Sequence, residues 1–185
     1  LRLVQLGVKP LLIHFDNGWN SELAVMNIQN IVDTLGLDLI TYVIDWDDFR
    51  ELQLAYLKAS VIDIEVLTDH AIYGAMYQVA IDQQITTIVS GVNVATEQVL
   101  PQGWIYDKLD DINIRSIYSA FGSGRKLTRY PFVDNSMRRK IRRSRIEIVR
   151  LLDQMIYDVE DAKGQIVQKL NWRAYEGKHF ESIFT

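Results

Sequence analysis

The sequence predicts an α/β fold in which helices cover a parallel sheet. Three short apolar runs, at 11–13, 39–44 and 86–89, are rich in aliphatic and β-branched side chains and are typical of buried strands. Amphipathic segments with helical spacing lie between and beside these runs, at about 20–35, 47–59 and 70–83. Strands and helices that alternate in this way are typical of a parallel sheet with helices packed on its faces.

The stretch at 11–24 (LLIHFDNGWNSELA) organises this prediction. Its apolar strand runs into a polar turn at 14–18, and Asn20 or Ser21 can cap the helix that follows. Open α/β sheets bind ligands where a buried strand passes through such a turn into a helix. We therefore expect the floor of a small-molecule site here, although a packed histidine at a strand end is the simpler interpretation of His14.

Two further polar clusters lie at expected element ends. Asp69 is predicted to cap the helix at 70–83, and a cap alone is as good an interpretation as a site. The segment at 90–97 (SGVNVATE) follows the third strand, and its Ser-Gly turn gives backbone N–H groups room to approach a phosphate. Glu97 can hold a hard cation such as Mg²⁺. Because carboxyl ends of parallel strands share one edge, this cluster and the first turn are expected on one rim.

The second half of the chain has a different texture, so we predict a core at 1–100 and a helical region at 101–185. A short helix is expected at 112–121, a helix at 159–170, and a long helix from 134 to about 158. The long helix would carry six cationic side chains near its start, which fit a solvated face, a phosphate contact or an acidic partner surface: Arg138, Arg139, Lys140, Arg142, Arg143 and Arg145.

Composition excludes several classes of protein. The 185 residues carry a formal net charge of −4, which argues against a general nucleic-acid binder. Cysteine is absent, so disulfides and thiolate metal sites are excluded. No apolar run reaches the roughly 20 residues that span a bilayer, and no signal peptide is recognisable, so we expect a cytoplasmic protein. Residues 1–6 resemble the last turns of a helix closed by Gly7, and we expect the chain to lack an N-terminal portion.

Several stretches in the expected order resemble one family, the N-acetyl sugar amidotransferases of surface-polysaccharide synthesis, a branch of the PP-loop ATP pyrophosphatases. They are HFDNGWNSELAVMNIQNIV, YVIDWDDFRELQLAYLKAS, TDHAI, SGVNVATE with the following LPQGW, and NWRAYEGKHFESIFT. The resemblance covers nearly the whole chain, and DNGWNSE and GKHFESIFT are its most specific motifs.

The resemblance implies a three-layer parallel sheet of the adenine nucleotide α-hydrolase type with a helical C-terminal extension. It implies that ATP activates the acetamido oxygen of a nucleotide-linked N-acetyl sugar through an adenylated intermediate, with release of pyrophosphate. Ammonia from a glutaminase partner then displaces AMP and leaves an acetamidino group, in lipopolysaccharide, O-antigen or related glycan synthesis. The sugar, the partner's identity and any homo-oligomer stay open.

The resemblance also implies roles for individual residues. Phe15, Asp16 and Asn17 would hold adenine and ribose. Asp69 and His70 would lie at the pocket mouth, with His70 transferring a proton. A second set matches a Gly-Thr-x-Asn-x-x-Glu pattern for nucleotide and Mg²⁺, with Glu97 on the metal: Ser90, Gly91, Asn93, Thr96 and Glu97. The tail would close over the sugar nucleotide or AMP, although a surface tail has a similar composition: Lys178, His179 and Glu181.

The chain also departs from the family pattern. The Ser-Gly-Gly-x-Asp-Ser phosphate loop and the cysteine pairs of a zinc site do not occur in it, and we expect both upstream of Leu1. Two other functions stay open. Sulfur transfer to tRNA by a PP-loop enzyme would need catalytic cysteines, and the chain has none. A non-catalytic nucleotide-binding scaffold would show no turnover.

Overall fold

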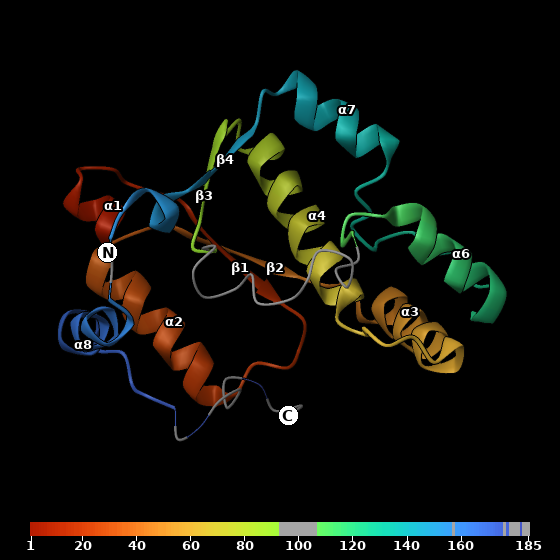
Figure 1. The fold of residues 1–185 in the computed structure, drawn as a ribbon, viewed down its shortest axis with the longest axis horizontal. Helices are drawn as coiled ribbons and strands as arrows, with labels where there is room; N and C mark the ends of the chain where they lie inside the picture. Colours follow the sequence, from red (N-terminus) through yellow and green to blue (C-terminus); the bar gives the residue numbers. More distant parts are fainter. Residues whose placement is uncertain (93–106, 157, 176, 178–181, 183–185) are drawn as a thin grey trace. The chain divides into compact units, whose positions relative to one another are not determined.

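Helices and two short parallel sheets make up the structure, a computed structural model that describes residues 1–92, 107–156, 158–175, 177 and 182 (Figure 1). The chain divides into two compact units. One comprises Leu1–Val43 with Ile156–Thr185, and the other comprises Ile44–Met155. The predicted class of mixed α/β structure is confirmed at this level.

The first unit is built on a strand–helix–strand segment. Strands β1 (Leu12–Asp16) and β2 (Leu39–Val43) pair in parallel, with Leu12 opposite Leu39 and Asp16 opposite Val43. Helix α2 (Glu22–Leu35) connects them, as the sequence predicts. Ser21 caps its start because the Ser21 hydroxyl accepts a hydrogen bond from the Ala24 N–H at 3.2 Å.

The remaining helices of this unit are α1 (Arg2–Gln5) and α8 (Val159–Leu170). Asn27 of α2 is only 1% exposed, and its amide pairs with both backbone groups of Arg173. The Arg173 N–H donates to Asn27 Oδ1 at 2.8 Å, and Asn27 Nδ2 donates to the Arg173 carbonyl at 2.9 Å. A buried polar side chain of α2 thus holds the segment after α8 against this helix.

The second unit has its core between helices α3 (Trp46–Ala59), α4 (Val66–Asp82) and α6 (Asp111–Phe121). Each begins close to its predicted position except α4, which begins at Val66 without a side-chain cap. The predicted cap at Asp69 is therefore wrong. Asp63 shapes the turn before α4 by accepting the Glu65 N–H at 3.1 Å, and Asp69 lies inside the first turn. The buried side chains include Phe49, Leu52, Tyr56, Leu67, Ala71 and Ile114.

A buried carboxylate fixes the segment that leads from α6 to α7 (Asn135–Arg143). Asp48 of α3 is 1% exposed, and its Oδ2 accepts the backbone N–H groups of Thr128, Arg129 and Tyr130 at 2.7, 2.6 and 3.1 Å. Burial alone would raise the pKa of Asp48, but these three donors and the charge of Arg125 hold it below its usual value. A charged acceptor inside the unit thus orders an aperiodic segment.

The long helix predicted from 134 to about 158 is wrong. Helix α7 ends at Arg143, and Arg145 adopts a left-handed conformation with φ of +52°. The chain then enters strand β4 (Glu147–Arg150), followed by the short 3₁₀ helix η2 (Leu151–Gln154). Strand β4 pairs in parallel with β3 (Thr87–Ser90), which places Ser90 opposite Arg150 (Figure 1). The β-branched residues around 146–149 favour a strand once β3 supplies a partner.

The strands form two separate two-stranded sheets, β1–β2 and β3–β4, so a three-layer PP-loop sheet stays a proposal. The boundaries of the two compact units differ from the predicted boundary between a core at 1–100 and a helical region at 101–185. That division into two regions also stays a prediction. Among the helices that the structure describes, none is long and apolar enough to cross a bilayer.

Candidate functional site

A pocket of about 560 Å³ lies at the carboxyl ends of β3 and β4. This is the edge at which parallel α/β sheets bind their ligands, and the volume suits a small molecule. Ser90 ends β3 and Arg150 ends β4, while α4 and η2 supply further walls. The lining residues are Tyr73, Met76, Ser90, Val92, Ile148, Val149, Arg150, Asp153 and Gln154.

Ser90, which the sequence predicts as a nucleotide contact, shapes one wall of this pocket. Its hydroxyl accepts a hydrogen bond from the Val92 N–H at 3.2 Å, which turns the chain immediately after β3. Gly91 lies in that turn and is exposed, with no atom near the place of a Cβ. The turn therefore leaves room for a ligand to approach the backbone, as a phosphate contact requires.

Arg150 brings a positive charge to the same pocket. Its side chain is exposed, and no described carboxylate forms an ion pair with it. A guanidinium group in this state can bind a phosphate or carboxylate through two parallel hydrogen bonds. The sequence does not point to Arg150 as a site residue, because 147–150 fall within the predicted long helix. A position at the end of a strand is not expected there.

The predicted metal site falls outside this description. Glu97, the expected Mg²⁺ ligand, lies outside the described residues, as do Asn93 and Thr96. Within the described part of the chain, no three carboxylates and histidines gather in a group that could hold a metal ion.

The polar turn after β1 belongs to the first unit. Asp16 Oδ1 accepts hydrogen bonds from the Gly18 N–H at 2.8 Å and from Asn20 Nδ2 at 3.4 Å. Asn17 Oδ1 accepts the Trp19 N–H at 3.2 Å, and Gly18 has a φ of +81° that only glycine adopts readily. The carboxylate of Asp16 thus first serves to build the turn, and its second oxygen is the one that a ribose hydroxyl could use.

Two neighbours complete the surroundings of this turn. Phe15 stacks on Tyr42 of β2 with ring centroids 6.1 Å apart, so its ring is partly used in packing. Asn20 forms an isolated antiparallel bridge with Ser182, one residue of the C-terminal motif GKHFESIFT. Lys178 and His179 of that motif lie outside the described residues.

Asp69 and His70 occupy a different place, inside the second unit. His70 is fully buried, Nδ1 lies 2.9 Å from the Lys108 carbonyl, and Nε2 accepts the Val133 N–H at 2.9 Å. These partners fit a neutral ring with its proton on Nδ1. Burial lowers the pKa of His70, which the Lys108 carbonyl and Asp111 only partly oppose. Neither residue lines the pocket at the β3–β4 edge.

The carboxylate of Asp69 belongs to a small group of ion pairs. Lys108 Nζ lies 3.0 Å from Asp69 and 2.5 Å from Asp63. Burial would lower the pKa of Lys108, but the two carboxylates raise it above its usual value. The group ties the segment before α6 to α4. No sequence pattern predicts it, because Lys108 is far from Asp63 and Asp69 in the chain.

No protein-family model matches the chain, and no curated protein does. The geometry of the site and the motifs of the sequence therefore carry the functional argument.

Proposed function

We propose that this chain is part of an ATP-dependent amidotransferase that converts the acetamido group of a nucleotide-linked N-acetyl sugar to an acetamidino group. The observation that carries the proposal is the pocket at the carboxyl ends of β3 and β4, which Ser90 and Arg150 both line. The sequence motifs support the specific reaction, since they distinguish an amidotransferase from other nucleotide-binding α/β proteins.

The proposed reaction has two steps. The acetamido oxygen attacks the α-phosphorus of ATP, and pyrophosphate leaves. Ammonia then adds to the former carbonyl carbon and loses a proton, and AMP leaves with the original oxygen. An unactivated amide resists ammonia because its oxygen is a poor leaving group, and adenylation removes that obstacle.

Residues of this chain are assigned to binding and positioning. Arg150 would contact a phosphate of the nucleotide, and the turn at Ser90 and Gly91 would bring backbone N–H groups to it. For Phe15, Asp16 and Asn17, contacts with adenine and ribose are proposed from the resemblance alone. For Lys178 and His179, contacts with the sugar nucleotide or AMP are proposed on the same basis. Mg²⁺ at Glu97 follows from the resemblance, and no step above depends on it.

Proton transfer by His70 is the weakest assignment. The side chain is buried, both ring nitrogens already have partners, and a proton on Nε2 would break the bond to the Val133 N–H. A structural role for His70 therefore fits the contacts better, and the pH experiment in the Discussion separates the two roles.

The direct test uses full-length protein, including any segment that precedes Leu1, with ATP, Mg²⁺ and ammonium. A panel of nucleotide-linked N-acetyl sugars is screened for pyrophosphate release. The proposal predicts release with one sugar, and a product lighter by the mass difference between O and NH. When the acetamido oxygen carries ¹⁸O, the label is expected in AMP.

The alternatives give different results in the same assay. A nucleotide-binding scaffold would bind ATP and release no pyrophosphate with any sugar. A tRNA-modifying enzyme would release pyrophosphate with tRNA and not with sugars. Label retained in the sugar product, despite pyrophosphate release, would contradict transfer of the amide oxygen to AMP.

A further inference from the structure

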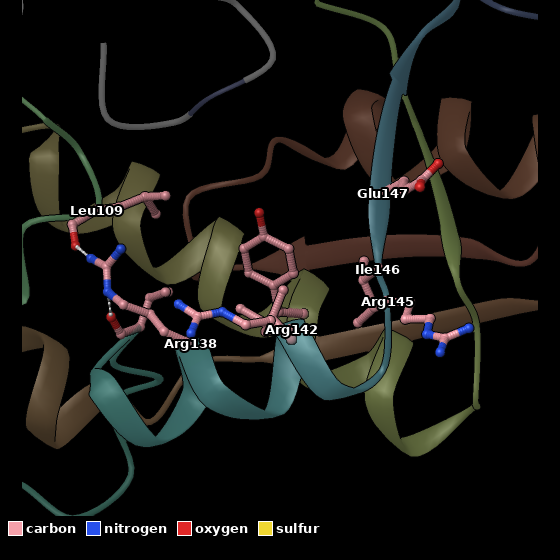
Figure 2. A pocket seen from close by; sticks show the side chains of 9 residues that line it. Leu109, Arg138, Arg142, Arg145, Ile146 and Glu147 are labelled. Carbon is pink, nitrogen blue, oxygen red and sulfur yellow. Dashed lines mark hydrogen bonds between the residues drawn. The ribbon is translucent and has the colours of Figure 1, made fainter.

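A second pocket of about 500 Å³ lies at the other end of β4, in the same unit. It is formed by α7, the end of α4, and the residues that lead into β4 (Figure 2). This pocket includes Glu147 at the start of β4, whereas the candidate site includes Ile148, Val149 and Arg150 toward the carboxyl end of that strand. It does not share a lining residue with that site.

Three arginines line this pocket, against one carboxylate. They are Arg138, Arg142 and Arg145, and the carboxylate is Glu147. Within the described part of the chain, no ion pair joins a carboxylate to any of these guanidinium groups. The chain as a whole has 24 acidic and 20 basic side chains, so this excess of positive charge is a local property of the pocket.

Arg138 is fixed in place by neutral groups. Its Nε donates to the Val133 carbonyl at 3.1 Å, and a terminal nitrogen donates to the Leu109 carbonyl at 2.5 Å (Figure 2). Carbonyl oxygens orient the guanidinium group without neutralising its charge. A half-buried cation in this state attracts an anion more strongly than an exposed one, because water screens it less.

Arg142 is one helical turn after Arg138 and therefore lies on the same face of α7. Figure 2 shows both side chains on the side of α7 that faces the pocket, whereas the side chain of Arg145 points away from them. Arg142 is exposed, and its guanidinium group has no hydrogen-bond or ion-pair partner among the described residues. The two guanidinium groups can therefore bind one phosphate from two directions.

The rest of the pocket wall is apolar and aromatic. Leu109, Val133, Ile141 and Ile146 line it, together with Tyr77. Burial raises the pKa of Tyr77, which Arg138 only partly opposes, so its hydroxyl stays protonated and can donate a hydrogen bond. An inorganic ion would fill only a small part of this volume. The walls suit a ligand that carries a phosphate and an organic body.

We propose that this pocket binds a phosphate ester, with Arg138 and Arg142 on the phosphate and Tyr77 beside the organic part. The site is separate from the nucleotide site, and the inference does not depend on the amidotransferase proposal. Phosphate rather than carboxylate is favoured because a phosphate group offers enough acceptor oxygens for two guanidinium groups at once.

The test is a calorimetric titration of the full chain with inorganic phosphate, glucose 1-phosphate and citrate. We expect saturable binding of glucose 1-phosphate, weaker binding of inorganic phosphate, and no competition by citrate. Arg142→Gln is expected to weaken glucose 1-phosphate binding about tenfold, the effect of losing one charge-assisted contact.

Arg143→Gln is the matched control, because Arg143 is an exposed arginine on the same helix that does not line the pocket. It is expected to bind glucose 1-phosphate as the wild type does.

Equal losses of binding in the two variants would show general attraction to a basic helix and overturn the proposal, as would equal binding of citrate. Loss of glucose 1-phosphate binding in Arg150→Gln but not in Arg142→Gln would show that the ligand binds in the other pocket. ATP-dependent pyrophosphate release is unaffected by Arg142→Gln in the expected case, which separates this proposal from the proposed function.

Discussion

At the scale of the residue, the resemblance assigns His70 a role without information on the burial of its side chain. A histidine beside an aspartate was predicted to lie at a pocket mouth, yet the ring is fully buried between the Lys108 carbonyl and the Val133 N–H. Tyr130 and Phe132 pack against the ring, with centroids 5.9 and 6.0 Å away. The side chain joins α4 to two segments that are distant in sequence, which no local pattern reveals.

The lowered pKa of His70 predicts a pH dependence of folding. The folded state keeps the ring neutral, while the unfolded chain binds a proton near pH 6.5. The stabilisation is therefore complete above pH 6.5 and is lost as the pH falls below it, by at most about 1.4 kcal/mol per pH unit. Urea unfolding between about pH 5.5 and 7.5 should show this slope in the wild type and a smaller one in His70→Asn.

The same variant separates the structural role from proton transfer. If His70 is structural, the folded fraction of His70→Asn keeps the wild-type pH profile of pyrophosphate release at a temperature where it is folded. A profile that loses one ionisation, with the urea slope unchanged, would contradict the structural interpretation.

At the scale of the element, helix α4 and the segment after α6 approach each other through Gly74. A Cβ placed on Gly74 would lie 1.9 Å from the Pro131 carbonyl oxygen, a backbone atom that cannot move away alone. Asp48 holds the same segment from α3 through three backbone N–H groups. The close packing of α4 against the segment after α6 therefore depends on the absence of a side chain at Gly74, and the buried carboxylate of Asp48 holds the same segment.

Gly74→Ala is predicted to destabilise the protein by about 1–3 kcal/mol, the usual effect of overpacking. The matched control is Gly164→Ala in α8, where nothing lies within 4 Å of the added Cβ. That change is expected to stabilise by about 0.5–1 kcal/mol, because alanine favours a helix interior. Chemical unfolding of both variants measures the difference. Similar effects of the two substitutions would contradict the close approach of α4 to Pro131.

Elements with strong local signals were predictable from the sequence. Helix α2 has a serine cap and Gly36 at its end, and α8 matches its predicted range. Strand β4 was not predictable, because its β-branched residues follow a helix without a proline and their partner β3 lies about sixty residues earlier. Because strand β4 was not predicted, Arg150 was not predicted as a site residue either.

At the scale of the whole molecule, the two parallel strand pairs give the chain the polar carboxyl edges that nucleotide-binding α/β proteins use. The sequence predicts one shared rim for two clusters, Ser90 with Gly91 and Asp16 with Asn17, and each of these residues lies at the end of a parallel strand or in the turn after it. Their joint rim stays a prediction, since the two edges belong to different units. The roles that the resemblance implies for Lys178, His179 and Glu97 stay predictions, because these residues lie outside the described part of the chain.

The central claim is that a nucleotide binds at the carboxyl ends of β3 and β4. It is tested most directly by equilibrium dialysis of labelled ATP against full-length wild type, Arg150→Gln and Arg139→Gln, the last being an exposed arginine of α7 that lines neither pocket. Arg150→Gln is expected to weaken ATP binding about tenfold, the effect of losing one charge-assisted contact, and Arg139→Gln is expected to bind ATP as the wild type does. Unchanged ATP affinity in Arg150→Gln, or an equal loss in both variants, would contradict it.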